Sequence, residues 1–321
     1  MKIIAVEEHI TTPELMTFSR AISGTVQLPD FLAQADERAR VDDKAHIEKR
    51  LKEMDEAGID MQVLSSGPDF QEGDASEATP LAMKLNDKIA EIIEEYPERF
   101  SGFAVIDPQD PVTAANELER AVKELGLKGT MIKSHVRGEY LDEQKYHVIL
   151  ERAEKLNVPI YLHPREPSPD MIKPYLTYPE LTGAMWGFAA DGGLHAMRLI
   201  FGGIFDKYPG LKIILGHMGE FIPFELWRID NRWLKDPCAK RLKKTPGQYF
   251  KENFYVTTSG MFSQPVLQLC CEVLGPDRIL FAVDFPHESD IEAVQFIESA
   301  SINANDKEKI GHLNIERLLG L

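Results

Sequence analysis

The sequence has few cysteines and little positive charge. Its 321 residues include only Cys238, Cys270 and Cys271, whose spacing fits neither a disulfide framework nor a thiolate metal site. We therefore expect reduced thiols in a cytoplasmic protein. Lysine and arginine number 36 against 52 acidic residues, and the formal net charge of −16 argues against nucleic acid and anionic membrane surfaces as partners. An anionic substrate would then need a local positive group, such as a metal ion or an arginine.

Long apolar runs and linkers are also missing. No segment approaches the roughly 20 apolar residues of a membrane span. The apolar start at residues 1–6 is too short for a signal peptide. No stretch rich in glycine, serine or proline divides the chain. We therefore predict a single domain over residues 1–321.

What the chain does contain is a regular alternation of short β-rich apolar segments and amphipathic helical segments, which is typical of parallel βα units. We predict strands at residues 3–7, 61–65, 102–106, 129–133, 158–163, 213–217, 253–259 and 278–284, and helices at 44–57, 81–96, 111–125, 144–156 and 194–207. About eight such strands predict a closed (β/α)8 TIM barrel of the α/β class. An open doubly wound sheet is the alternative, but no Gly-x-Gly-x-x-Gly motif follows the first strand.

Metal-competent side chains lie at the ends of four predicted strands. Glu7 and His9 end the first strand, and residues two apart in extended backbone point to the same side. His163, His217 and Asp284 end the fifth, sixth and last strands. The carboxyl ends of barrel strands form one rim, where the active sites of this fold are built. We therefore predict a metal-dependent enzyme in which Glu7, His9, His163 and Asp284 bind Zn²⁺ or Mn²⁺, because imidazole and carboxylate suit both ions.

Three further polar residues are candidates for the predicted rim or its surroundings. His195 lies in a predicted helix and is either a core histidine or a residue that contacts substrate. Lys133 ends the fourth strand, where a carboxylated lysine bridges two metals in some hydrolases, although a salt-bridged lysine is the simpler interpretation. His287 follows Asp284 by three residues and is a candidate for the rim.

Several motifs are similar to one known superfamily and together span nearly the whole chain. Among them are Ala5-Val6-Glu7-Glu8-His9, Tyr161-Leu162-His163-Pro164-Arg165, Ile214-Leu215-Gly216-His217-Met218-Gly219-Glu220, Trp227-Arg228-Ile229-Asp230 and the segment from Asp277 to Asp284. Through them the sequence resembles the amidohydrolase superfamily and, within it, the non-oxidative aromatic acid decarboxylases. The γ-resorcylate, 2,3-dihydroxybenzoate and 5-carboxyvanillate decarboxylases are the enzymes it resembles.

The resemblance implies a set of site residues. One divalent metal per subunit would be held by Glu7, His163 and Asp284. His9 would add a ligand where the resembled decarboxylases often carry alanine. His217 would be the active-site histidine and Glu220 the carboxylate that orients it. Arg228 would reach the substrate, in some members across a subunit interface, since these enzymes are typically homodimers or homotetramers.

The reaction implied is loss of CO₂ from a small hydroxylated benzoate-like acid, which leaves a phenol. Asp284 is then the candidate donor of the proton to the ring carbon, and Phe188, Trp186 and Phe285 are candidates to wall the ring. The alternative is a hydrolase of the same superfamily that opens a lactone or an amide, for which His9 and Lys133 would approximate a two-metal site. A barrel kept only for binding is a third hypothesis.

Overall fold

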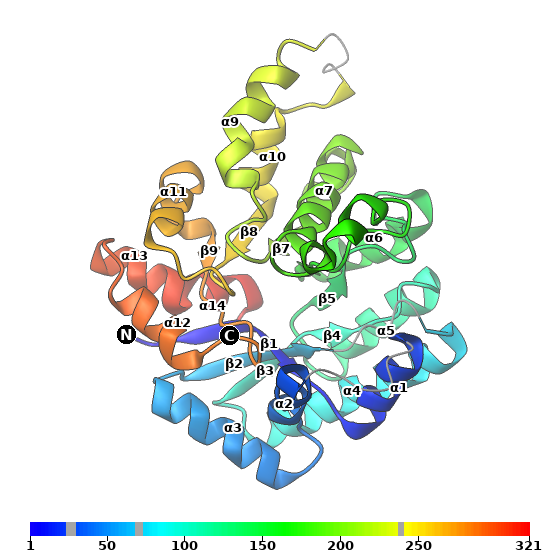
Figure 1. Ribbon diagram of the computed structural model, residues 1–321, viewed down its shortest axis with the longest axis vertical. Helices are drawn as coiled ribbons and strands as arrows, with labels where there is room; N and C mark the ends of the chain where they lie inside the picture. Colours follow the sequence, from blue (N-terminus) through cyan, green and yellow to red (C-terminus); the bar gives the residue numbers. More distant parts are fainter. Residues whose placement is uncertain (24–29, 68–72, 237–240) are drawn as a thin grey trace.

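The protein is a closed barrel of parallel strands surrounded by helices (Figure 1). The computed structural model describes residues 1–23, 30–67, 73–236 and 241–321. The strands are β1 (Ile4–Ile10), β2 (Met61–Ser66), β3 (Phe100–Gly102), β4 (Ala104–Val105), β5 (Thr130–Lys133), β6 (Ile160–His163), β7 (Ile213–Leu215), β8 (Phe254–Thr257) and β9 (Ile279–Leu280). Their ladders are all parallel and run in the orders β1-β2-β3 and β4 through β9.

Backbone hydrogen bonds join the two ladders into one barrel. β3 and β4 are halves of a single barrel strand interrupted at Phe103, whose amide donates to the carbonyl of Leu64 at 2.9 Å. On the other side, the amide of Val6 in β1 donates to the carbonyl of Phe281 after β9 at 3.1 Å. The predicted TIM barrel is confirmed, with β3 and β4 counted as one of its eight strands.

The helices cover the outside of this barrel. They are α1 (Pro13–Ser23), α2 (Asp30–Ala39), α3 (Lys44–Ala57), α4 (Ala75–Glu95), α5 (Pro111–Lys123), α6 (His147–Leu156), α7 (Gly187–Phe201), α8 (Ile204–Lys207), α9 (Ile222–Trp233), α10 (Pro246–Asn253), α11 (Gln264–Leu274), α12 (Asp290–Glu298), α13 (Ala304–Glu308) and α14 (Asn314–Leu319). Helices α9 and α10 project from the barrel as an arm (Figure 1). No helix of the described residues is long and apolar enough to cross a membrane.

Local signals explain the helix ends. The Asp43 side chain accepts a hydrogen bond from the amide of His46, and Gly58 adopts a left-handed φ of 82°, so α3 has the bounds predicted from the sequence. The predicted helix from residue 81 instead begins at Ala75. Asp74 caps this earlier start, and the helix accommodates Pro80.

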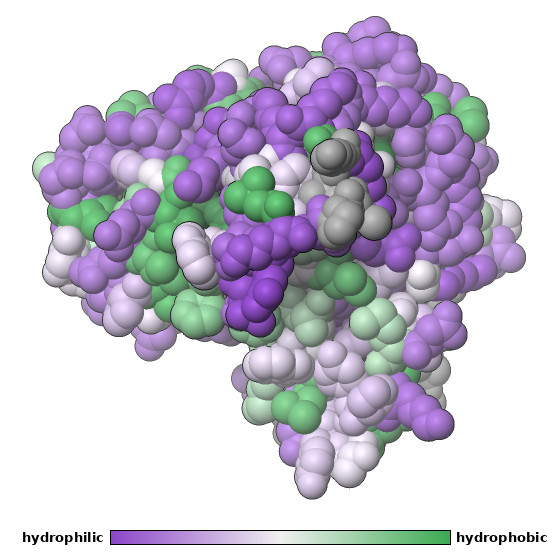
Figure 2. All heavy atoms as spheres, turned by 90° about the horizontal axis from the view of Figure 1, so that it is seen from above, coloured by the Kyte–Doolittle hydropathy of each residue, from purple (hydrophilic) through white to green (hydrophobic). Residues whose placement is uncertain are grey.

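Two apolar layers hold the barrel together. One fills its interior with side chains from the strands, among them Val6, Tyr161 and Leu280, and is completed by Ile315 and Leu319 of α14. The larger layer lies between the strands and the surrounding helices. The face seen in Figure 2 is mainly hydrophilic, with apolar residues gathered in patches. Cys270 and Cys271 are free thiols, and Cys238 lies outside the described residues.

Several predicted strands are longer than the observed ones, and two of them were predicted to end at site residues. β7 ends at Leu215 and β9 ends at Leu280, so His217 and Asp284 lie in the turns that follow. Both residues have positive φ values, 48° and 80°, which extended strand geometry does not allow. Turns after the strand ends therefore aim these two side chains.

Candidate metal centre and active site

Glu7 enters the site through a β-bulge in β1. The pairing of β1 with β2 shifts between Val6 and Glu8, and Glu7 has a φ of 86°. The expectation that Glu7 and His9 share a side of a regular strand is therefore wrong in its geometry, although both side chains reach the site. The Tyr161 hydroxyl donates to Glu7 Oε2, which fixes this carboxylate in the barrel interior.

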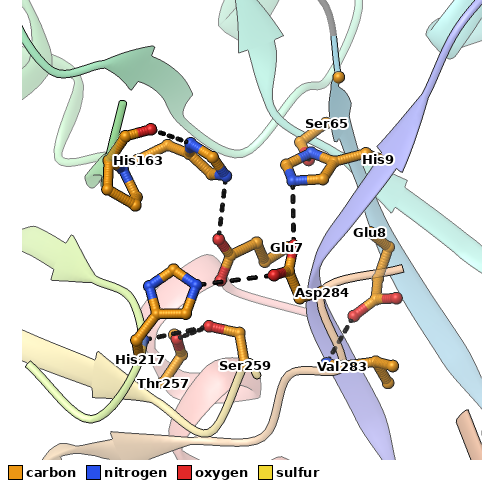
Figure 3. A network of polar contacts seen from close by, with 12 residues as sticks. Glu7, Glu8, His9, Ser65, His163, His217, Thr257, Ser259, Val283 and Asp284 are labelled. Atoms are coloured by element: carbon orange, nitrogen blue, oxygen red, sulfur yellow. Dashed lines mark hydrogen bonds and ion pairs between the residues drawn. The ribbon is translucent and has the colours of Figure 1, made fainter. Parts of the chain in front are cut away.

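Two histidines present ring nitrogens to the carboxylates of this site (Figure 3). His163 Nδ1 donates to the carbonyl of Pro164 at 2.7 Å, and its Nε2 lies 3.3 Å from Glu7 Oε1. His9 Nδ1 lies 3.1 Å from Ser65 Oγ, and its Nε2 lies 3.4 Å from Asp284 Oδ1. Burial lowers the pKa of His9 to about 4 and that of His163 well below its usual value. Both rings are therefore neutral at neutral pH, and His163 Nε2 carries a lone pair.

The arrangement of acceptors suits a cation. Ligand atoms of Glu7, His9, His163 and Asp284 all lie within 4.8 Å of one another. Glu7 Oε1 and Asp284 Oδ1 are buried and have no hydrogen-bond partner, which is costly unless a cation binds there. Burial and the charge of Asp284 also raise the pKa of Glu7, to about 7. Two carboxylates and two imidazoles suit a divalent ion such as Mn²⁺ or Zn²⁺.

His217 stands beside this cluster on a left-handed turn. All residues from 217 to 221 have positive φ values, and such backbone is rare outside functional sites. Within the turn, the amide of His217 donates to Ser259 Oγ at 3.2 Å. His217 Nε2 lies 3.6 Å from Asp284 Oδ2 (Figure 3). Its Nδ1 lies 2.6 Å from Glu220 Oε1. The turn thus places one imidazole between a buried carboxylate and a candidate metal ligand.

Opposing effects set the charges of His217 and Asp284. Burial alone would lower the pKa of His217, but the adjacent Glu220 carboxylate and the nearby Asp284 raise that pKa well above its usual value. Burial alone would raise the pKa of Asp284, but the nearby His217 and His9 rings hold it well below its usual range. These effects favour an imidazolium at His217 that faces a carboxylate at Asp284.

A buried polar network behind the site joins its two sides. Arg50 Nη1 donates to the carbonyl of His9 at 2.9 Å, and its Nε donates to Gln62 Oε1 at 2.6 Å. Glu8 Oε1 accepts from the amide of Val283 at 3.0 Å, next to Asp284 in the chain. The network connects β1 to the turn that carries Asp284. Sequence reasoning missed it, although Glu8 stands between two predicted ligands.

A cavity of about 420 Å³ opens beside His217 and Asp284. Phe188, Met261, Val266 and Leu269 supply apolar walls, so Phe188 is where a ring could stack. The two other predicted wall residues do not line this cavity. Phe285 is fully buried, with the guanidinium of Arg50 4.2 Å from its ring centroid. Trp186 is exposed and packs against Phe221 with ring centroids 5.2 Å apart.

His195, the predicted substrate contact, does not line this cavity. Its ring is completely buried, its Nε2 accepts from the amide of Leu141 at 3.0 Å, and its Nδ1 lies 3.2 Å from Ser134 Oγ. The Ser134 hydroxyl donates in turn to Asp191. With both ring nitrogens engaged, His195 is a structural residue that holds the segment after β5.

Lys133 and Arg228 have different surroundings. Lys133 pairs in register with His163 at the carboxyl ends of β5 and β6, and its Nζ donates to the carbonyl of Gly67. This contact suits a charged lysine. Arg228 is exposed on α9 and does not line the cavity of its own subunit. His287 lies next to His9, with ring centroids 6.2 Å apart.

Comparisons with known proteins place the chain in a family. Residues 9–321 match the family described as Amidohydrolase. The γ-resorcylate decarboxylase of Polaromonas sp. strain JS666 is 40% identical over 328 residues, which cover 99% of this chain and 98% of the relative. A similar enzyme from Rhodococcus jostii is also 40% identical, with the same coverage.

Solved structures are similar over the full chain. The dihydroxybenzoic acid decarboxylase of Polaromonas sp. JS666, with manganese and 2-nitroresorcinol bound, superposes with a TM-score of 0.90 at 39% identity, covering 100% of this chain and 97% of the other. The 5-carboxyvanillate decarboxylase of Novosphingobium aromaticivorans, complexed with manganese and 4-hydroxy-3-methoxy-5-nitrobenzoic acid, superposes with a TM-score of 0.93 at 36% identity, covering 100% and 96%. On its fold, its candidate metal centre and this full-length similarity, the chain belongs to the amidohydrolase family.

Proposed function

We propose that this protein is a manganese-dependent carbon–carbon lyase that removes CO₂ from an ortho-hydroxylated aromatic acid and leaves the phenol. The observation that carries the proposal is the pair of buried, unpartnered oxygens of Glu7 and Asp284, which face two neutral histidines beside His217. The full-length similarity to manganese-bound hydroxybenzoate decarboxylases supports it. These relatives favour the decarboxylase over the hydrolase alternative.

The metal would be held by Glu7, His9, His163 and Asp284, one ion per subunit. When bound, it would chelate the substrate carboxylate and the ortho oxygen and stabilise their negative charge. We propose Mn²⁺ because the solved relatives contain it, although the same donors also suit Zn²⁺. The ion and His217 supply the local positive charge that an anionic substrate needs in a chain of net charge −16.

Asp284 would move the proton. Its low pKa makes it a carboxylate in the resting site, so it can accept the proton of the substrate hydroxyl. It then delivers this proton to the ring carbon that bears the carboxylate, the bond to that carboxylate breaks, and CO₂ leaves. The phenolate oxygen of the product takes up one proton from solvent, which balances the reaction.

His217 would orient the substrate beside this carboxylate. Glu220 is buried, and its contact with Nδ1 fixes the imidazole ring so that Nε2 points toward Asp284. A protonated Nε2 can donate to an oxygen of the substrate carboxylate or hydroxyl. This role requires the ring position and the charge of His217, whereas metal binding does not require His217.

Replacement of His217 by asparagine is therefore expected to lower kcat by about 10²–10⁴-fold, as removal of an acid/base or orienting group does. Manganese content, measured by elemental analysis, should remain near that of the wild type. His147→Asn, on α6, is the matched control and should keep normal rates. Near-normal turnover by His217→Asn would show that His217 is structural.

The substrate class can be tested with a panel of hydroxybenzoates. Manganese-loaded protein should release CO₂ and the matching phenol from an ortho-hydroxybenzoate and not from its meta or para isomers, because only the ortho oxygen can chelate together with the carboxylate. Removal of the metal with a chelator should stop the reaction, and Mn²⁺ should restore it. Release of no CO₂ from any member of the panel would refute the proposed function.

We propose that residues 1–321 act as one domain in the cytoplasm and that two or four copies associate. The free thiols Cys270 and Cys271 suit a reducing compartment.

Association of copies is supported by the arm, where α9 exposes Phe224 (75%) and Trp227 (77%) beside Arg228. Exposed apolar patches of this kind mark protein interfaces. A second copy on this face would bring Arg228 close to the neighbouring site.

Trp227→Lys should weaken this association, because it places a charge in the apolar patch. Light scattering should then give a mass approaching the 36.3 kDa of one chain, whereas the wild type should give at least a dimer. Ile291→Lys, at an exposed apolar position on α12, is the matched control and should keep the wild-type mass. A monomeric wild-type protein would contradict the proposed assembly.

A further inference from the structure

A chain of three hydroxyl groups connects the candidate metal centre to the turn that carries His217. The Tyr161 hydroxyl donates to Glu7 Oε2, and its oxygen lies 3.0 Å from Thr257 Oγ1. Thr257 Oγ1 lies 2.8 Å from Ser259 Oγ. Ser259 Oγ in turn accepts from the amide of His217 at 3.2 Å (Figure 3). This hydroxyl chain therefore joins a predicted metal ligand on β1 to a backbone amide after β7.

The two ends of the hydroxyl chain set the direction of its hydrogen bonds. The amide of His217 can only donate, and an ionised Glu7 can only accept. Each hydroxyl has a single hydrogen, so one arrangement makes all four bonds together. In this arrangement Ser259 donates to Thr257, and Thr257 donates to Tyr161. Every hydrogen is then directed toward the carboxylate, and hydrogen bonds in such a series strengthen one another.

Bulk water does not reach the hydroxyl chain. The side chains of Tyr161, Thr257 and Ser259 are completely buried. A Cβ at Gly216 would lie 3.4 Å from Tyr161 Oη and 3.5 Å from both Glu7 Oε2 and Ser259 Oγ, so these three oxygens converge beside one point of the backbone. Loss of the Tyr161 hydroxyl would therefore leave Glu7 Oε2 with one donor fewer and no bulk water to replace it.

We propose that Tyr161 is a positioning residue for the metal centre, which holds Glu7 through Oε2 and keeps Oε1 facing His163, where the ion would bind. Glu7 Oε1 is buried without a hydrogen-bond partner and lies 3.3 Å from His163 Nε2. Thr257 supports Tyr161 by donating to its oxygen. The inference rests on the metal centre proposed above. It makes metal affinity depend on a hydroxyl group that hydrogen-bonds to a ligand and is not itself a ligand.

Tyr161→Phe removes this hydroxyl and keeps the ring that packs in the barrel interior. Calorimetric titration of the metal-free variant with Mn²⁺ should give a Kd about 10–100-fold above that of the wild type. Thr257→Val removes the next hydroxyl at nearly constant volume and should raise the Kd by roughly threefold or more, the scale of one hydrogen bond. The double variant should have the Kd of Tyr161→Phe alone, because Thr257 acts on Glu7 through Tyr161.

Tyr249→Phe is the matched control. The buried Tyr249 hydroxyl also donates to a carboxylate, that of Asp206, and neither residue is in the candidate metal cluster. This variant should have a lower melting temperature and an unchanged Kd for Mn²⁺.

A wild-type Kd in Tyr161→Phe would overturn the inference, even with a lower melting temperature, because Tyr161 would then be structural only. The inference also fails if the effects of Tyr161→Phe and Thr257→Val multiply in the double variant. Either result would leave the metal centre and the proposed reaction standing. A wild-type protein that binds no Mn²⁺ would instead refute the metal centre, and this inference with it.

Discussion

His163→Ala is expected to purify with almost no manganese and to be inactive. Its Nε2 is one of two neutral imidazole nitrogens in the cluster, and alanine leaves Glu7 and Asp284 with one nitrogen ligand fewer. Loss of a residue that hydrogen-bonds to a metal ligand lowers metal affinity by about 10–100-fold. Loss of a ligand itself should therefore lower the affinity at least as much. The measurement is elemental analysis of purified protein together with titration of the metal-free protein with Mn²⁺.

The control for this variant is His195→Gln. His195 is buried on α7 and bonds to Leu141 and Ser134, so its replacement should lower stability without removing a ligand. Folded His195→Gln should bind a full equivalent of metal. Full metal occupancy in His163→Ala would show that the cluster around Glu7 is not the metal centre.

Asp284→Asn is expected to lower kcat for CO₂ release by about 10³-fold or more. The variant lacks both the group that delivers the proton and a negative charge that would balance the charge of the metal ion. Asparagine keeps an oxygen that can ligate but has no proton to deliver to the ring. Binding of an unreactive analogue, such as an ortho-nitrophenol, should remain measurable because Glu7, His9 and His163 are intact. Stopped-flow rates and calorimetric titration of the same preparation separate these two effects.

Asp277→Asn provides the matched control, since Asp277 is exposed and paired with Lys309 far from the cluster. It should keep normal rates. An Asp284→Asn variant that still decarboxylates at near wild-type rates would rule out Asp284 as the proton donor, whatever its role in metal binding.

The sequence predicted the barrel and the main site residues for a physical reason. Each βα unit ends its strand at the same rim, so His163 at the end of β6 and His9 in β1 must approach each other once the barrel closes. The position of each histidine along its strand was therefore enough to predict that both lie at the rim, although His9 and His163 are 154 positions apart in the sequence. The prediction that His195 contacts substrate had no such basis, since His195 lies in a helix and no strand end fixes its position.

The parts that escaped prediction depend on contacts between distant segments. The bulge at Glu7 is visible only from the register of β1 against β2, and the left-handed turn at residues 217–221 only from its backbone angles. Arg50 reads as an ordinary helical arginine in the sequence. Its burial against Phe285 and the carbonyl of His9 follows from the packing of α3 on the barrel. Burial lowers the pKa of Arg50 to about 10, so it stays cationic at neutral pH.

The central claim is that this site exchanges CO₂ for one proton at an aromatic carbon. Its most direct test is conversion of a carboxyl-labelled ¹³C ortho-hydroxybenzoate in D₂O by the manganese-loaded enzyme, followed by mass spectrometry and NMR. The account predicts ¹³CO₂ and phenol in equal amounts, with a deuteron at the vacated ring carbon. Failure to release ¹³CO₂ from any ortho-hydroxylated aromatic acid, together with metal-dependent hydrolysis of a lactone or an amide, would contradict it.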